Sequence, residues 1–190
     1  MEKLKELIRP LGRSVIALLL ALGVSAAVGQ VSKEELHLTV TMVTGEHSRD
    51  SNSTTTTLTV ERDTLVYEQS QHGAHSASRK PLKREYKLTS EDQAALIKVL
   101  QEKNLLGSKT VSALPLEQRP QSYFSLVIRT RLNRLQGLGE NEHSTTITGP
   151  RNGAKLKENQ TYRDSIYLIE QLYKIINRTE ADVSMPQLLN

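Results

Sequence analysis

Two histidines in one polar segment are the first residues whose types suggest chemistry. His72 and His75 stand three residues apart in the run His-Gly-Ala-His, and imidazole nitrogen is a common zinc ligand. Zinc needs a third and usually a fourth ligand, whereas the nearest acid, Glu68, belongs to a segment with strand character. This spacing alone is unspecific. We therefore interpret the pair as solvated loop histidines, and expect no metal and no cofactor.

A dense basic cluster follows directly. The run from Arg79 to Arg84 reads Arg-Lys-Pro-Leu-Lys-Arg, and such a cluster could contact a phosphate, an anionic lipid surface or an acidic partner. It has no interleaved aromatic residues of the kind that stack on single-stranded nucleic acid. A solvated loop or a protease-sensitive hinge explains it as well. Arg79 and Lys80 are its candidate contact residues.

A third candidate surface lies on the longest predicted strand. Between residues 122 and 132, Phe124, Leu126, Ile128 and Leu132 alternate with Tyr123, Val127, Arg129 and Arg131. Tyr and Arg are enriched at binding hot spots, so Tyr123, Arg129 and Arg131 form a candidate recognition patch. An ordinary solvated strand face is the alternative.

No sequence motif specifies a reaction. The chain has no Gly-x-Ser-x-Gly elbow and no Gly-x-x-x-x-Gly-Lys phosphate loop. Paired acids such as Glu34-Glu35 and Glu91-Asp92 are explained by strand ends and helix caps. A catalytic triad can still assemble in space, so a hydrolase that uses His37 or His143 beside an acid remains an alternative, but an enzyme is not our first expectation.

The elements that position these residues are read from periodicity. Alternating apolar residues predict a strand over 35–43, a hairpin over 54–68, a short strand over 84–88, the strand over 122–132 and a return strand over 143–148. The segments 70–83 and 108–121 are expected to be a loop and a connector.

Two helices are predicted. The first begins at Thr89, whose hydroxyl is followed three residues later by Asp92 in a capping pattern, and it is closed by Gly107. The second covers 161–176, with an apolar stripe and a similar pattern at Thr161 and Asp164; Asn159 and Asn177, both in Asn-x-Thr triplets, flank it and could also serve as caps.

The order of elements, β-β-β-(β)-α-β-β-α, predicts an α+β fold. We expect an antiparallel sheet of about five to six strands with two helices packed on one face. The opposite face carries Thr, Arg and Tyr, and is expected to be wet or to bind something.

The N-terminus predicts export. Four basic and two acidic residues precede an uncharged run from Ser14 to Gly29 that is too short to span a bilayer readily, and small residues end it. We predict a secretory signal peptide over 1–29, cleaved between Gly29 and Gln30, with cleavage between Ala26 and Ala27 as the second possibility. We predict a single α+β domain over 30–178 and a loose tail over 179–190. An uncleaved membrane anchor is the alternative.

Composition limits the partners. The chain has a formal net charge of +4, and removing the leader leaves only +2, which is too small to suggest nucleic-acid binding. The absence of cysteine excludes disulfide scaffolds and thiol chemistry. The sequence thus favours a secreted or periplasmic binding or protein-interaction module, with another protein or an envelope component as partner and no permanent membrane span after cleavage. A secreted hydrolase and an envelope assembly protein are the alternatives.

Overall fold

The computed structural model describes residues 35–46, 52–73, 80–113, 122–133, 142–150 and 154–180, together with Val183 and Met185. The predicted signal peptide, its cleavage point at Gly29 and Gln30, His75 and Arg79 lie outside these residues. The strands are β1 Glu35–Glu46, β2 Ser53–Glu61, β3 Thr64–His72, β4 Leu82–Lys87, β5 Lys109–Ser112, β6 Ser122–Asn133 and β7 Glu142–Pro150. The helices are α2 Ser90–Glu102, α3 Ala154–Glu158 and α4 Gln160–Asn177.

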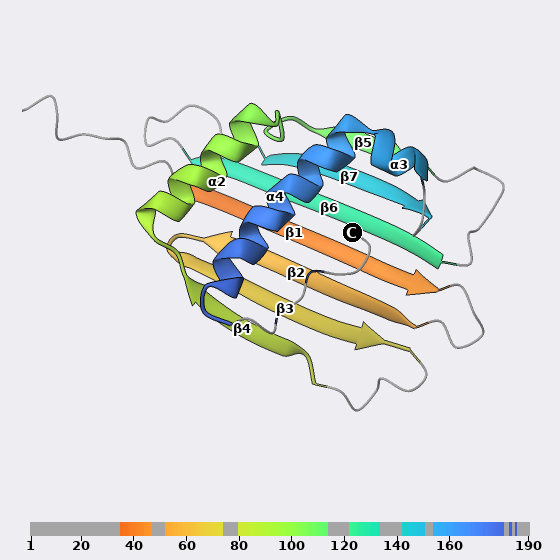
Figure 1. The fold of residues 1–190 in the computed structure, drawn as a ribbon, viewed down its shortest axis with the longest axis horizontal. Coiled ribbons are helices and arrows are strands. Elements are labelled where there is room, and N and C mark those ends of the chain that lie inside the picture. Colours follow the sequence, from red (N-terminus) through yellow and green to blue (C-terminus); the bar gives the residue numbers. More distant parts are fainter. Residues whose placement is uncertain are drawn as a thin grey trace, which may run out of the picture. The chain divides into compact units, whose positions relative to one another are not determined.

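The strands form one mostly antiparallel sheet in the order β4-β3-β2-β1-β6-β7-β5 (Figure 1). β1 lies at its centre and pairs with β2 on one side and with β6 on the other. Only β5 and β7 run parallel among the described pairs. The fold class is α+β, as predicted.

The predicted count of five to six strands is wrong, because the described sheet has seven. The additional strand, β5, lies in the segment interpreted as a connector. Its four residues show too little alternation to be read from sequence, and it forms because β7 offers it backbone partners from Thr145 to Thr148. The loop predicted over 70–83 is also shorter than expected, since β3 continues to His72 and β4 begins at Leu82.

Alternation explains the remaining strands. In β1, Leu36, Leu38, Val40 and Met42 are all at most 2% exposed, whereas the residues between them are partly exposed. The β2–β3 turn uses Arg62 at φ 53°, a left-handed conformation that tightens the reversal at a small cost.

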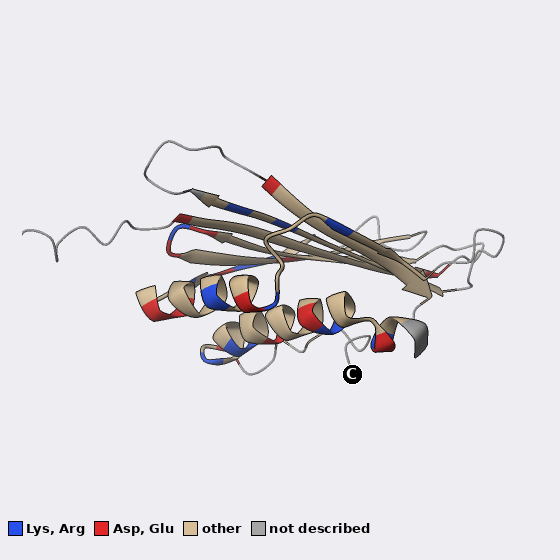
Figure 2. Cartoon of the chain, turned by 90° about the horizontal axis from the view of Figure 1, so that it is seen from above, with Lys and Arg blue, Asp and Glu red and all other residues tan. Residues whose placement is uncertain are grey.

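Both long helices cover one face of the sheet (Figure 2). Thr89 caps α2 in a full capping box: its hydroxyl accepts from the Asp92 N–H, and the Asp92 carboxylate accepts from the Thr89 N–H. α2 ends at Glu102, and Asn104, not Gly107, takes the left-handed conformation that follows it (φ 50°).

Of the two predicted caps for α4, Asn159 is confirmed and Thr161 is wrong. Asn159 is the N-cap, and its side chain accepts from the Tyr162 N–H at 3.2 Å. Thr161 therefore lies inside the helix, and the carboxylate of Asp164 accepts from Gln160 at 2.8 Å. The short helix α3, which was not predicted, precedes this cap.

Ion pairs join α2 to α4 at both ends. Asp92 accepts from Arg178 at 2.7 Å, and Lys103 lies 3.5 Å from Asp164. The start of one helix thus meets the end of the other, so the two run antiparallel. Lys103 also lies 5.0 Å from the centroid of the Tyr167 ring.

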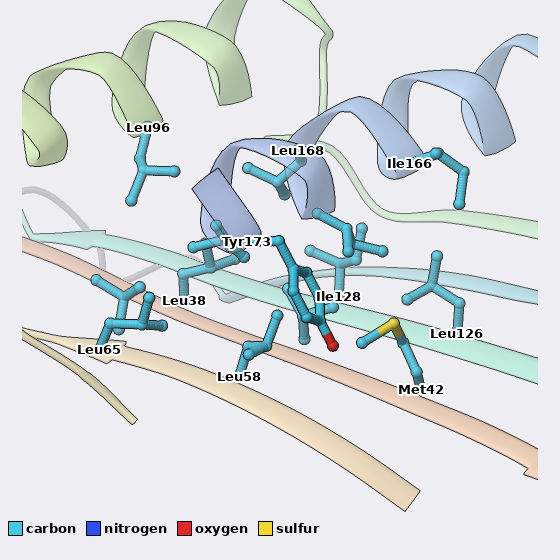
Figure 3. Packing of buried hydrophobic residues seen from close by; sticks show 14 of the residues in the cluster. Leu38, Met42, Leu58, Leu65, Leu96, Leu126, Ile128, Ile166, Leu168 and Tyr173 are labelled. Carbon is cyan, nitrogen blue, oxygen red and sulfur yellow. The ribbon is translucent and has the colours of Figure 1, made fainter. Parts of the chain in front are cut away.

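The core lies between the helices and the sheet. Tyr173 of α4 extends toward the sheet between Leu58 and Ile128 (Figure 3), and its ring meets Tyr67 edge-on, with centroids 6.4 Å apart. Its buried hydroxyl has no hydrogen-bond partner among the described residues. Val183, beyond α4, is 6% exposed and belongs to the same core.

Candidate functional site

The sheet face opposite the helices contains the predicted recognition patch. Tyr123, Arg129 and Arg131 alternate along β6 with the buried Phe124, Leu126, Ile128 and Thr130, so they project from this open face. Arg129 is exposed, and Tyr123 and Arg131 are half-buried. The structure thus brings these three residues to one face, as their alternation predicts.

The strand register places Arg129 beside Thr39 and Ser144 across the sheet, and its neighbours along the same face of β6 are Val127 and Arg131. Three ladders, each five strands wide, cross the middle of the open face from β3 to β7. They are Val66-Thr59-Thr39-Arg129-Ser144, Glu68-Thr57-Thr41-Val127-Thr146 and Ser70-Thr55-Val43-Ser125-Thr148. We call these fifteen residues the hydroxyl field, because ten of them are Ser or Thr.

Charge is scarce in the hydroxyl field. Three of its residues are Val, and only Glu68 and Arg129 are charged; these two are exposed, and the other residues of the field are half-buried. Solvated sheet faces usually carry many charged residues, and about a quarter of this chain is charged. The field is therefore less charged than the chain as a whole.

The hydroxyls at the centre of the field have no hydrogen-bond partners in the part of the chain that the structure describes. Thr39, Thr41, Thr55, Thr57 and Thr59 make no side-chain hydrogen bond among the described residues. Each hydroxyl can donate one hydrogen bond and accept two. The centre of the field thus offers donors and acceptors together, with threonine and valine methyl groups between them.

Charged residues border the field on two sides. On the β4 side, Lys83 lies 3.8 Å from Glu68 and 3.3 Å from Glu85, so this trio carries a net charge of −1. Beyond the first ladder, Glu35 lies 3.9 Å from His37 and 3.6 Å from Arg62. Arg129 has no ion pair among the described residues.

Tyr123 lies beyond the third ladder, where its ring covers Gly45 of β1. A Cβ built on Gly45 would lie 2.5 Å from Cε1 of that ring, so the ring rests directly on the glycine backbone. A glycine at this register position leaves the space that the tyrosine side chain occupies on the open face.

The described residues of the predicted basic cluster do not all share one surface. Lys80 is exposed, but Arg84 turns to the helix-covered face and pairs with Glu180, which also accepts from the Tyr86 hydroxyl at 3.1 Å. Arg84 thus joins β4 to the segment after α4. For this residue, the interpretation as part of a solvated loop is wrong, because an acid distant in sequence lies beside it.

The histidines do not form a metal site within the described part of the chain. No group of three or more His, Asp or Glu residues there could hold a metal ion. His72 is exposed, and its Nε2 lies 3.1 Å from the Ser70 hydroxyl on the same strand. His143 is half-buried on β7, opposite Thr130.

The residues described below, whose pKa values are shifted from their ordinary values, lie on the helix-covered side of the sheet. Burial raises the pKa of Tyr162 and Tyr173, and for Tyr67 burial acts together with the nearby Tyr86. For Asp92, burial alone would raise the pKa, but hydrogen bonds from Thr89 and Arg178 outweigh it and lower the pKa. These groups hold the core and the helix pair together, and none of them lies on the open face.

Sequence reasoning missed two parts of this surface. In the sequence, Glu68 stands out only as the acid nearest to the two histidines, and nothing connects Lys83 and Glu85 with the open face, because their proximity depends on the β3–β4 register. The threonines could have been found: positions 39, 41, 55, 57 and 59 alternate with buried residues.

The chain matches none of the protein-family models, and no curated protein is significantly similar to it in sequence. In the residues described, no helix combines the length and the apolar character that a bilayer crossing requires.

Proposed function

We propose that this protein is a binding or protein-interaction module that acts outside the cytoplasm, and that its contact surface is the open face of the sheet. The observation that carries the proposal is the neutral, hydroxyl-rich centre of that face. The helices bury the other face of the sheet, so the open face is the broad sheet surface that a partner can reach. Interface centres are typically poor in charge and bordered by a polar rim, which is how charge is distributed here.

Tyr123, Arg129 and Arg131 are the proposed anchors on this surface, because aromatic and Arg side chains dominate binding energies. The test is a pulldown from envelope extract with the tagged chain as bait. We expect one enriched protein, and we expect Tyr123→Ala combined with Arg129→Ala to lose it. Lys98→Glu, on the exposed side of α2, is the matched control and should retain it. Equal recovery by both variants would refute the proposed surface.

Export is a separate part of the proposal and rests on residues 1–29. The intact mass of the protein recovered outside the cytoplasm should correspond to a chain that begins at Gln30. A mass that still includes residues 1–26 would refute cleavage and favour an anchor.

The alternative function, a secreted hydrolase, has one specific observation in its favour. The Ser70 hydroxyl lies 3.1 Å from Nε2 of His72, which is the distance at which a histidine can accept a proton from a serine nucleophile. No acid that would orient His72 is paired with it among the described residues. A fluorophosphonate probe should label Ser70 if this pair is catalytic, and His72→Ala should abolish the labelling; no labelling of the wild-type chain would refute the alternative.

A further inference from the structure

We infer that the partner of the open face is a second copy of this chain, packed face to face on the hydroxyl field. The inference rests on the proposed function, since it names the partner of the same surface. A two-fold interface requires a surface that is complementary to itself. Hydroxyl groups meet this requirement because each is both donor and acceptor, whereas a face of one charge would repel its copy.

The two charges of the field determine where the symmetry axis lies. Arg129 is on β6, and the Glu68–Lys83–Glu85 trio, with its net charge of −1, is on β3 and β4. An axis that runs parallel to the strands, between β1 and β2, places β6 of each copy over β3 of the other. Arg129 then faces Val66 of the second copy, whose neighbours are Glu68 along β3 and Glu85 across on β4.

The same axis pairs the threonines with each other. Thr39 faces Thr59 of the second copy, and Thr41 faces Thr57, because these residues share ladders on β1 and β2. Their hydroxyls, which lack partners among the described residues, can hydrogen-bond across the interface. The methyl groups of the threonines and valines fill the space between sheets that pack about 10 Å apart.

The size of the field fits a weak dimer. The axis between β1 and β2 also places β7 of each copy over β4 of the other, so the overlap is six strands wide. With strands about 4.8 Å apart and alternate residues about 6.8 Å apart along a strand, three ladders across six strands cover about 600 Å². Two copies would bury about 1,200 Å² in total, which is at the lower limit for a specific interface. We therefore expect association at micromolar concentrations.

Sedimentation equilibrium of the chain, as recovered from the producing cells, tests the inference over a range of concentrations. We expect the wild-type chain to dimerise reversibly. Arg129→Glu should raise the dissociation constant at least tenfold, because the new carboxylate faces the acidic trio. Glu68→Lys should do the same, and the double variant should regain association within about threefold of wild type, because the opposite charges meet again.

Two further variants keep the result interpretable. Thr41→Lys should abolish association by placing a charge at the centre of the field, whereas Lys98→Glu on α2 should leave it unchanged. Circular dichroism shows whether each variant is folded. A dimer indifferent to Thr41→Lys, or a double variant that fails to recover, would overturn the inference.

A wild-type chain that stays monomeric at all concentrations would also overturn self-association. If that monomer still captured a different protein in the pulldown, the proposed interaction module would stand with another partner. A monomer that captured nothing would refute both.

Discussion

Asp92 joins α2 to α4, and its replacement should weaken the fold more than that of any neighbouring acid. Its carboxylate accepts from the Thr89 N–H at 3.1 Å, from the Thr89 hydroxyl at 2.9 Å and from Arg178 at 2.7 Å. The side chain is only 7% exposed, whereas that of Arg178 is 62% exposed. The hydrogen bonds from Thr89 therefore stabilise the Asp92 carboxylate as much as the ion pair with Arg178 does.

The magnitude follows from these contacts. Losing one half of a capping box costs about 1 kcal/mol, and losing a negative charge in the first turn of a helix costs about 0.5 kcal/mol. The pair with the well-exposed Arg178 adds about 0.5 kcal/mol. We expect Asp92→Ala to lower the free energy of unfolding by about 2 kcal/mol, measured by urea denaturation followed by circular dichroism.

Glu91→Ala is the matched control. Glu91 occupies the same turn with the same charge but is exposed, so its loss should cost only about 0.5 kcal/mol. If the two variants are equally stable, the contacts of Asp92 contribute nothing and the reasoning is wrong.

The pH dependence gives a second measurement of the same contacts. The pKa of Asp92 is lower in the folded than in the unfolded chain, so its contribution is present above the unfolded value, about 3.9, and is lost as the pH falls through the folded value. The stability difference between wild type and Asp92→Asn should therefore be constant near neutral pH and shrink in acid below about pH 4. An unchanged difference in acid would contradict this account.

Three other substitutions test the packing. Tyr173→Phe should change the free energy of unfolding by less than about 0.5 kcal/mol, or raise it, because it removes a buried hydroxyl without a partner among the described residues; a loss above about 1 kcal/mol would indicate a hidden partner. Gly45→Ala should cost about 1–3 kcal/mol through its clash with the Tyr123 ring, and Tyr123→Ala should remove most of that cost in a double-mutant cycle. Val183→Ala should cost about 1–2 kcal/mol in urea denaturation, because Val183 is buried in the core; no effect would show that this contact does not stabilise the domain.

Local patterns in the sequence predicted much of the fold. The alternation in β1 and β6 identified their inward and outward residues, and the Thr89–Asp92 spacing identified the start of α2. These features depend on neighbours within a few residues. β5 depends instead on a partner strand more than thirty residues away, and a four-residue segment carries too little pattern to indicate it.

The candidate surface divides in the same way. Alternation along β6 placed Tyr123, Arg129 and Arg131 on one face from sequence alone. The link between Glu68, Lys83 and Glu85 and the turn of Arg84 toward Glu180 could not be predicted, because strand register and the path of the chain after α4 bring them together. The sequence thus predicted which side chains share a face of a strand, but it did not predict which residues of other elements they contact.

The central position of β1 has a consequence for how the chain reaches its native state. The first four strands are joined by local reversals, but β1 also needs β6, and the pairs run from Glu35 with Asn133 to Glu46 with Ser122. Contacts between residues so far apart in sequence form slowly, because a long loop must close before any of them is gained. Until β6 arrives, the backbone groups along one edge of β1 are unsatisfied and open to strands of other chains. A newly made chain therefore passes through a period of vulnerability to aggregation that ends only when its second half has emerged.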